Sequence, residues 1–238
     1  MSEINTLEDM QNAYVNKGYI MLNTGVKEPW MLEMVSEHFG SLRGGTFWDK
    51  YYEVKYDPVS EPVSDSVALS PTELLLHTDG TFEASPPDNV AFQCVQNDIE
   101  GFGNSVLVDV WELIERLAEP TRQVLLETQF RFQRTGKGVT ANVDAPILER
   151  NGESYKVRYR RDSKYKLSPP TKEAEIALTN FEQALALQDL QKTIYLKPGD
   201  ILFVNNQRML HGRTALSGTR PRILRRFWVS AGSEQVHS

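Results

Sequence analysis

The sequence has one cysteine, four histidines and no long apolar run among its 238 residues. A single cysteine excludes a disulfide within the chain and the paired cysteine ligands of a zinc deaminase. We expect Cys94, in the strand-like stretch NVAFQCVQ, to be a small buried residue and not a reactive thiol. Nowhere do about 18 apolar residues follow one another, and the N-terminus has no basic start followed by an apolar segment. We therefore expect a cytoplasmic protein without a membrane span.

A surplus of basic residues is also absent, because the formal net charge is −6. Nucleic acids and anionic membranes bind proteins that present a basic surface. We expect neither as a partner. The expected partner is a small-molecule substrate, and the composition gives no sign of the oligomeric state.

Nucleotide-binding glycine motifs are missing too. Neither GxGxxG after a strand nor GxxxxGK[ST] occurs, which argues against a Rossmann or P-loop domain. Many separate short strand signals are present instead, and the length fits one domain spanning residues 1–238. The sequence therefore predicts a mainly β fold with flanking helices, a double-stranded β-helix or jelly roll.

Apolar periodicity and turn residues place the individual elements. Strands are expected at 19–23, 51–56, 74–79, 90–96, 105–110, 130–134, 193–196, 200–206 and 223–230, and helices at 5–16, 28–40, 109–129 (broken at Pro120) and 171–189. A hairpin is expected over 146–160, because Asn151-Gly152 is typical of a type I′ turn. Two long segments, 44–73 and 135–153, have an irregular composition typical of lids or binding loops.

The stretch LLLHTDGTF places two polar residues, His77 and Asp79, at the end of an apolar strand. Alternation along a strand turns both side chains to the same face, where an imidazole and a carboxylate can share a metal ion. The same pattern also fits a strand end that simply reaches the surface. A metal site needs a third ligand.

His211 is the candidate for that ligand, because His38 lies in an expected helix and His237 in the terminal tail. It follows the apolar strand 200–206, and strand pairing across a sandwich would bring it to His77. Two histidines and one carboxylate form the facial triad of non-haem Fe(II) oxygenases. A strand-end histidine bonded to the backbone is the structural alternative.

The C-terminal strand TRPRILRRFWVS carries arginines among core-forming residues. Arg222 and Arg226 share one face by alternation unless a bulge intervenes. A buried guanidinium needs an anionic partner, and a bound dicarboxylate would supply one. Pairing with a surface Asp or Glu is the structural alternative for either arginine.

The HTDGTF stretch, His211 in NNQRMLHGR and the arginine-rich tail resemble the Fe(II)/2-oxoglutarate-dependent dioxygenases of the TauD/TfdA group, including its carbapenem synthase and clavaminate synthase branch. The likeness covers roughly residues 70–230, while the first 70 residues match only in helix–strand–helix order.

The resemblance implies His77, Asp79 and His211 as iron ligands. It implies that Arg222 holds the far carboxylate of 2-oxoglutarate, with Arg225 as the alternative if the loop after His211 bends differently. Ser105 in GNS stands where the family often has a threonine that touches the same carboxylate, and Arg226 matches a position that contacts the cosubstrate or an anionic group of the substrate.

The resemblance also implies the reaction. Fe(II), 2-oxoglutarate and O2 would together oxidise a substrate C–H bond by hydroxylation, desaturation or cyclisation, with release of succinate and CO2. The expected substrate is a small polar, amino-acid-derived metabolite of a natural-product pathway. Halogenases of this superfamily have a small residue in place of the carboxylate ligand, so Asp79 argues against halogenation.

Candidate substrate residues lie in two stretches. In ESYKVRYRR, Lys156, Arg158 and Arg160 alternate with apolar residues, which favours a solvated hairpin face over an anion-binding surface. If the hairpin covers the iron, Arg158 or Arg160 would hold a substrate anion, and Trp48 in GTFWDKYY would form a wall of the pocket.

Two other functions remain open at this point. The first is a non-catalytic jelly-roll module that binds a small molecule, in which His77, Asp79 and His211 are structural. The second is a nucleic-acid demethylase of the same superfamily, against which the acidic balance argues.

Overall fold

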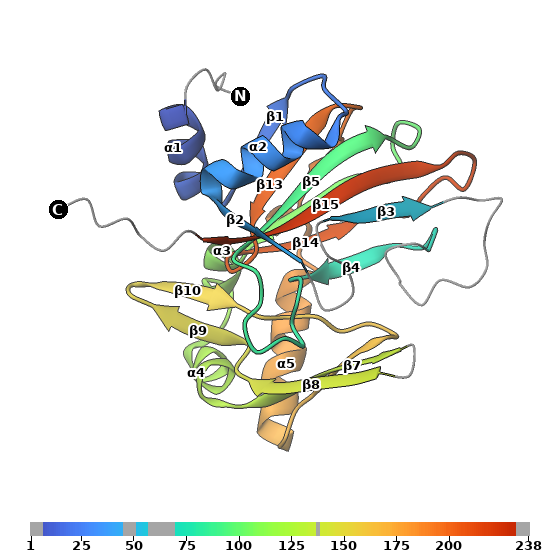
Figure 1. Ribbon diagram of the computed structural model, residues 1–238. Coiled ribbons are helices and arrows are strands. Elements are labelled where there is room, and N and C mark those ends of the chain that lie inside the picture. Colours follow the sequence, from blue (N-terminus) through green and yellow to red (C-terminus); the bar gives the residue numbers. More distant parts are fainter. Residues whose placement is uncertain (1–6, 45–50, 57–69, 137–138, 232–238) are drawn as a thin grey trace.

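The computed structural model describes residues 7–44, 51–56, 70–136 and 139–231. Two antiparallel sheets form its centre (Figure 1). The larger sheet has the order β1 (Tyr19–Asn23), β13 (Asp200–Asn205), β5 (Asn89–Gln96), β15 (Arg222–Ala231) and β2 (Gly40–Arg43), and β3 (Tyr52–Tyr56) also pairs with β15. The smaller sheet has the order β12 (Lys192–Ile194), β6 (Ser105–Asp109), β14 (Met209–Arg213) and β4 (Leu74–His77).

The two sheets enclose an apolar layer because their strands alternate between inward and outward side chains. This layer joins Leu107 and Met209 of the smaller sheet to Cys94, Leu202 and Leu224 of the larger one. The site described below lies between the same two sheets.

Two helices, α1 (Leu7–Lys17) and α2 (Pro29–Phe39), cover the outer face of the larger sheet (Figure 1). Their apolar sides pack on Phe203 and Phe227, which project outward from β13 and β15. Gly18 ends the first helix. Its N–H donates to the Tyr14 carbonyl, and its positive φ of 71° is a conformation that glycine adopts without steric strain.

A long insertion between β6 and β12 forms the lower part of the molecule in Figure 1. It contains α3 (Val110–Ile114), α4 (Glu119–Glu127), β7 (Phe130–Gly136), β8 (Val139–Ala145), β9 (Leu148–Asn151), β10 (Ser154–Val157), β11 (Tyr165–Ser168) and α5 (Lys172–Leu185). Its core, built around Phe130, Phe132 and Phe181, continues onto Val108 and Leu210 of the smaller sheet. The insertion is therefore packed against the back of the strands that carry the site.

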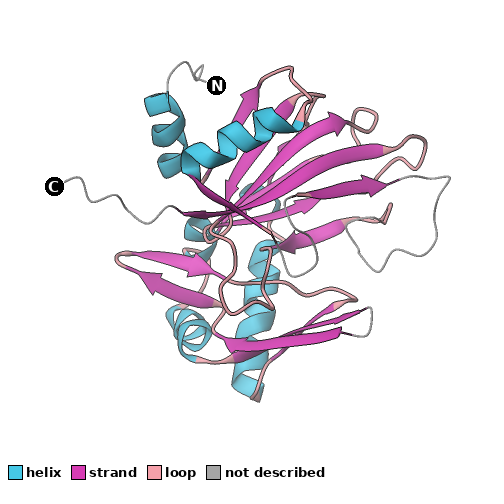
Figure 2. Ribbon diagram, viewed as in Figure 1, coloured by secondary structure: helices cyan, strands magenta, loops and turns pink. Residues whose placement is uncertain are grey.

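Most expected elements are confirmed, and strands predominate as Figure 2 shows. The expected loop at 135–153 was wrong in part, because residues 139–145 form β8 and complete a three-stranded sheet with β7 and β11. The strands β2, β11 and β14 were not expected, since each has only four or five residues and a weak local signal.

The hairpin of β9 and β10 is confirmed, but its turn lies one residue later than expected. Asn151 pairs with Ser154, so Gly152 and Glu153 form the turn, and the positive φ of 63° falls on Gly152. Pro120 lies in the first turn of α4 and begins that helix, a position where its missing N–H costs nothing.

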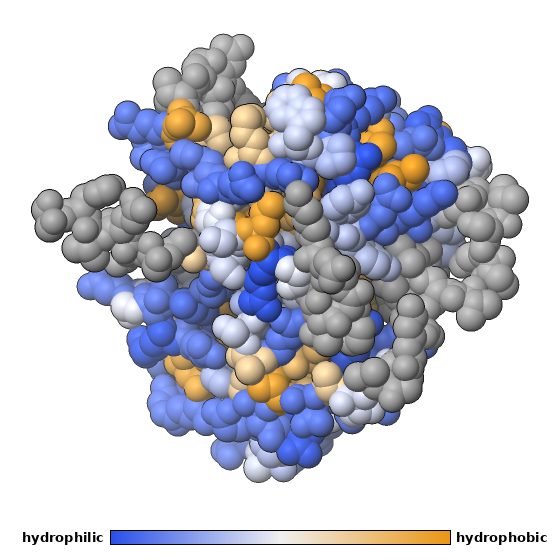
Figure 3. All heavy atoms as spheres, in the orientation of Figure 1, coloured by the Kyte–Doolittle hydropathy of each residue, from blue (hydrophilic) through white to orange (hydrophobic). Residues whose placement is uncertain are grey.

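Hydrophilic residues predominate on the face seen in Figure 3, and hydrophobic residues appear there in small groups. Within the part of the chain that the structure describes, no helix is long and apolar enough to cross a bilayer.

Candidate active site

His77, Asp79 and His211 come together between the two sheets, and all three are buried. His77 ends β4 and lies directly opposite His211 in β14, so strand pairing sets the two rings 4.5 Å apart. The Nε2 atoms of His77 and His211 lie 3.6 and 3.9 Å from Oδ1 of Asp79. This is the only cluster of potential metal ligands found among the described residues.

The position of Asp79 does not come from strand alternation, contrary to the sequence-based expectation. β4 ends at His77, and Asp79 lies in the following turn. Its backbone N–H donates to Oδ1 of Asn206 at 2.8 Å, and Nδ2 of Asn206 donates to its carbonyl at 3.1 Å. A side chain from the other end of the sequence therefore holds the turn that carries the carboxylate.

The structural alternative for His211, a histidine at the end of a strand, does not match the structure. The strand 200–206 ends in a turn, and His211 lies in the middle of the separate strand β14. Phe92 packs edge-on against its ring at a centroid distance of 5.4 Å.

The donor set fits a divalent metal ion. Nδ1 of His77 lies 2.8 Å from the Leu75 carbonyl, which requires a proton on Nδ1 and leaves the Nε2 lone pair facing Asp79. Burial lowers the pKa of His77 and lowers the pKa of His211 to about 3, so both rings are neutral. Two neutral imidazoles and one carboxylate, with donor atoms within 4.8 Å of one another, make the ligand set of a facial triad.

Asp79 stays ionised although it is only 1% exposed. Burial raises the pKa of Asp79, but the Arg226 guanidinium outweighs this effect and holds the pKa well below its usual range. Nη1 of Arg226 lies 2.8 Å from Oδ2, and the indole N–H of Trp228 donates to the same oxygen at 2.9 Å. The carboxylate is thus fixed in orientation before any metal binds.

The side chain of Arg222 is buried and has no anionic partner among the described residues. It is 6% exposed, and among the described residues no hydrogen bond or ion pair to its side chain is present. Burial lowers the pKa of Arg222 to about 10, although Cys94 and Asp98 nearby act in the opposite direction. The carboxylate of Asp98 is itself occupied by Ile99 and Ser217.

The segment that precedes Ser105 lies against Arg222. Gly103 has a positive φ of 64°, and a Cβ added there would come within 3.0 Å of Cδ and 3.1 Å of Nε of Arg222. Ser105 follows as the first residue of β6. The structure thus brings the GNS stretch of the smaller sheet to the arginine of the larger sheet.

The remaining sequence candidates are placed as follows. The register shift in the pairing of β15 with β5 falls on β5, whereas β15 pairs with β3 in continuous register from Arg222 to Arg226, so the expected alternation in β15 is kept. Arg225 donates to the Lys27 carbonyl and to Gln93, away from Asp79. Trp48 falls outside the described residues.

The expected solvated face of the hairpin was wrong for two of its arginines. β10 ends at Val157, and the chain beyond it turns toward the metal site. Arg158 donates to the carbonyls of Thr81, Glu83 and Ala84. Arg160 is buried, with Nη1 3.8 Å from Oδ1 of Asp79.

Sequence reasoning missed Asn206, Trp228 and Arg213. Arg213 is buried and donates to the carbonyls of Ser70, Thr72 and Thr214, which fixes the segment leading into β4. Because β14 itself was not expected, the alternation that places Arg213 two residues after His211 in this strand could not be used from the sequence. No local signal points to Asn206.

The family model of "Taurine catabolism dioxygenase TauD, TfdA family" matches residues 2–228. The chain belongs to this family. Clavaminate synthase 2 of Streptomyces clavuligerus is 28% identical over 187 residues, which cover 75% of this chain and 54% of that protein. Gamma-butyrobetaine dioxygenase of Pseudomonas sp. (strain AK-1) is 27% identical over 226 residues, which cover 90% of this chain and 57% of that protein. The TauD family chain thus spans about half the length of the curated relatives it matches.

Solved structures agree with this membership in fold. An asparagine oxygenase in complex with Fe(II), 2S,3S-3-hydroxyasparagine and succinate superposes with a TM-score of 0.74 at 20% identity, over 94% of this chain and 78% of that one. The non-haem iron oxygenase OrfP in complex with Fe and alpha-ketoglutaric acid gives a TM-score of 0.70 at 16% identity, over 94% of this chain and 79% of that one. The jelly-roll prediction is confirmed.

Proposed function

We propose that this TauD family chain is an Fe(II)- and 2-oxoglutarate-dependent dioxygenase that oxidises a C–H bond of a small, polar, amino-acid-derived metabolite. The observation that carries the proposal is the buried cluster of His77, Asp79 and His211, whose three donor atoms lie within 4.8 Å of one another. Membership in the TauD, TfdA family and the Fe-containing structural neighbours support the same assignment.

In this proposal His77, Asp79 and His211 hold Fe(II), which with 2-oxoglutarate and O2 supplies the oxidising chemistry and releases succinate and CO2. Arg222 binds the far carboxylate of 2-oxoglutarate, which would give its buried guanidinium an anionic partner. Ser105 lies beside the same carboxylate. Arg226 and Trp228 keep the Asp79 carboxylate aimed at the metal through their contacts with Oδ2.

The substrate class, the pathway, the location and the number of domains are further parts of the proposal. An amino-acid-derived substrate and a natural-product pathway are supported by the relatives, among them clavaminate synthase 2 and the asparagine oxygenase. A cytoplasmic location is supported by the single free, buried cysteine. A single dioxygenase domain is supported by the apolar core that runs from the insertion onto the smaller sheet.

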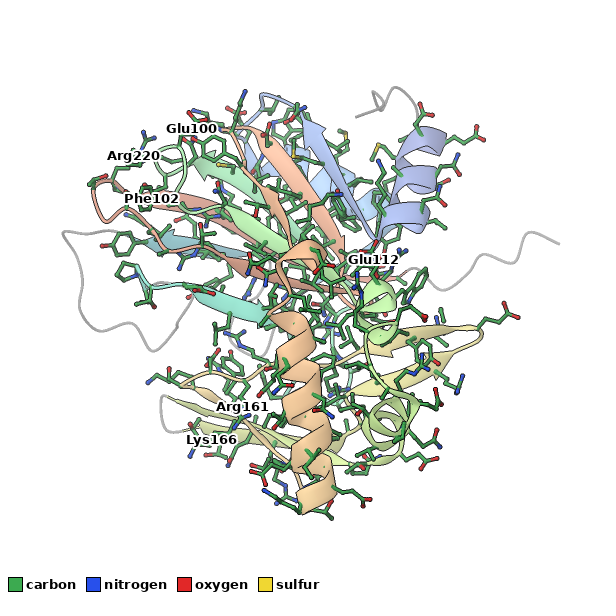
Figure 4. All side chains as sticks on the ribbon, turned by 180° about the vertical axis from the view of Figure 1, so that it is seen from behind. Glu100, Phe102, Glu112, Arg161, Lys166 and Arg220 are labelled. Carbon is green, nitrogen blue, oxygen red and sulfur yellow. The ribbon has the colours of Figure 1, made fainter. Side chains whose placement is uncertain are left out.

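The test is an anaerobic titration of metal-free protein with Fe(II) and 2-oxoglutarate, followed through the visible metal-to-ligand charge-transfer band. We expect the band in the wild type, its loss in Asp79→Ala, and a much weaker 2-oxoglutarate affinity in Arg222→Ala. Arg220→Ala is the matched control, because Arg220 (labelled in Figure 4) lies two residues away at an exposed position and donates a hydrogen bond to Asn97. A well-folded wild type that gives no band would favour a non-catalytic binding module.

A further inference from the structure

A second guanidinium approaches the metal site from the insertion. Arg160 is 6% exposed, and its Nη1 lies 3.8 Å from Oδ1 of Asp79, the oxygen that Arg226 contacts at 3.1 Å from the other side. Nε of Arg160 donates to Asp162, and its guanidinium stacks on the Tyr165 ring at 3.6 Å. Within the described residues, Nη1 and Nη2 of Arg160 have no hydrogen-bond partner.

The backbone around Arg160 is tied to both segments that carry the metal ligands. The N–H of Val157 donates to the Gln207 carbonyl at 2.7 Å, four residues before His211. The N–H of Thr78 donates to the Tyr159 carbonyl at 2.7 Å, between His77 and Asp79. Arg160 therefore keeps a fixed position relative to the metal ligands, as a specificity-determining group must.

The two carboxylates near Arg160, those of Asp162 and Asp79, already have other partners. Asp162 accepts from the N–H groups of Lys164 and Tyr165 as well as from Arg160. Asp79 is shared between Arg160 and Arg226 in the metal-free state and becomes a ligand once a dication binds. With Asp79 bound to a metal and Asp162 bonded to Nε, Arg160 would have no carboxylate among the described residues left to pair with its Nη atoms.

We infer that the substrate is an acid of net negative charge, in class a small amino dicarboxylate, with one carboxylate bound by Arg160 beside the metal. This inference rests on the proposed function and narrows its substrate class. A carboxylate accepts the free N–H groups of a guanidinium as a charged, bidentate partner. A neutral amide of the same shape lacks that charge. A cationic side chain would be repelled by the guanidinium groups of Arg160 and Arg226.

The experiment compares acids with their amides on the anaerobic Fe(II)·2-oxoglutarate complex at saturating 2-oxoglutarate. L-aspartate is paired with L-asparagine and L-glutamate with L-glutamine, and L-ornithine serves as a cationic probe. Binding is read from the change in shape of the visible band and from the rise in Tm of the anaerobic complex, and turnover is read from succinate release. An acid that merely competes with 2-oxoglutarate would lower the intensity of the band and so be distinguished.

Three variants assign the effect to Arg160. We expect Arg160→Gln to raise the apparent Kd of the acid by about tenfold to a hundredfold, which corresponds to loss of a charge-assisted contact. Its charge-transfer band in the absence of substrate should remain. Arg160→Lys should recover part of the affinity, because the charge returns without the fork geometry. Arg161→Gln is the control, since Arg161 is the next residue but turns to Glu182 of α5 (Figure 4).

Each outcome decides the inference. An acid that perturbs the band in the wild type, while its amide does not, supports it, provided that Arg160→Gln and not Arg161→Gln weakens the effect. Amides or ornithine performing as well as the acids, no acid perturbing the band, or equal behaviour of the two glutamine variants would overturn it. Failure of the band itself to form would instead count against the proposed function.

Discussion

Asn206 binds both polar groups of the Asp79 main chain, although the two residues are 127 positions apart in the sequence. The same amide also donates to the Pro87 carbonyl at 2.9 Å, so all three bonds are made by one buried side chain. The turn that presents the carboxylate is thereby fixed to the segment that leads into β14 and His211. Asn206 is therefore a positioning residue for Asp79.

Asn206→Ala should therefore weaken metal binding without removing a ligand. We expect Fe(II) affinity to fall by about tenfold to a hundredfold, as is typical when an outer-shell partner of a ligand is lost. The free energy of unfolding should fall by about 1–3 kcal/mol, because polar groups of the Asp79 turn lose their partner in a buried place. Anaerobic metal titration and urea unfolding measure the two effects.

The control for that variant is Asn180→Ala. Asn180 lies on α5 in the insertion and donates to Thr121 at 3.1 Å. It should lose some stability and keep the metal affinity of the wild type. Equal metal affinity in the two variants would contradict a positioning role for Asn206.

Arg222 and Arg213 are matched in burial but differ in their partners. Burial lowers the pKa of each to about 10, yet Arg213 donates to three carbonyls and Arg222 has no partner within the described residues. Arg222→Met should leave the free energy of unfolding of the metal-free protein unchanged or higher, because a buried unpaired charge is removed. Arg213→Met should lower it by about 1–3 kcal/mol, because three carbonyls lose a charged donor.

Addition of 2-oxoglutarate and a divalent metal separates the two further. The Tm of Arg213→Met should still rise on ligand addition, whereas that of Arg222→Met should respond far less. If Arg222→Met destabilises the metal-free protein as much as Arg213→Met does, the Arg222 guanidinium has a structural partner, and its role as the binding site for an anion is contradicted.

A comparison of alanine substitutions at Gly103 and Gly101 distinguishes the effect of backbone strain from the effect of contact with Arg222. Both have positive φ, 64° and 89°, but a Cβ at 101 meets nothing within 4 Å whereas one at 103 meets the Arg222 side chain at 3.0 Å. Substitution of either glycine by alanine should lower the free energy of unfolding by about 1–2 kcal/mol through the left-handed backbone. Only Gly103→Ala should also weaken 2-oxoglutarate binding, as measured in the charge-transfer titration.

The raised pKa of the buried Cys94 thiol predicts that the free energy of unfolding falls at high pH. Burial raises the pKa of this thiol from 9.0 to about 11. The protonated thiol is therefore favoured by folding, and this contribution is fully present below about pH 9 and is lost as the pH rises toward about 11. Two pH units correspond to about 2–3 kcal/mol. Urea unfolding of the wild type and of Cys94→Ala across this range measures the difference, and parallel pH profiles would show that Cys94 does not contribute.

The chemical identity of the site is a property that the sequence determined by itself. Alternating apolar residues mark most strands, and a histidine and an aspartate two residues apart at the end of one of them mark half of the proposed metal site. Arg222 was identified because a charged residue in a core-forming strand needs a partner. These features are local, and each depends on only a few neighbouring residues.

The tertiary structure alone decided how these residues meet. Asp79 faces the two imidazoles because Asn206 holds its turn, and strand alternation is not the cause. Arg160 reaches the same carboxylate because Val157 and Tyr159 bond to the ligand-bearing segments, so a sequence that resembles an exposed hairpin face becomes part of a buried site. These contacts join segments that are far apart in the chain. They depend on how both sheets and the insertion pack together, so a local sequence pattern does not predict them.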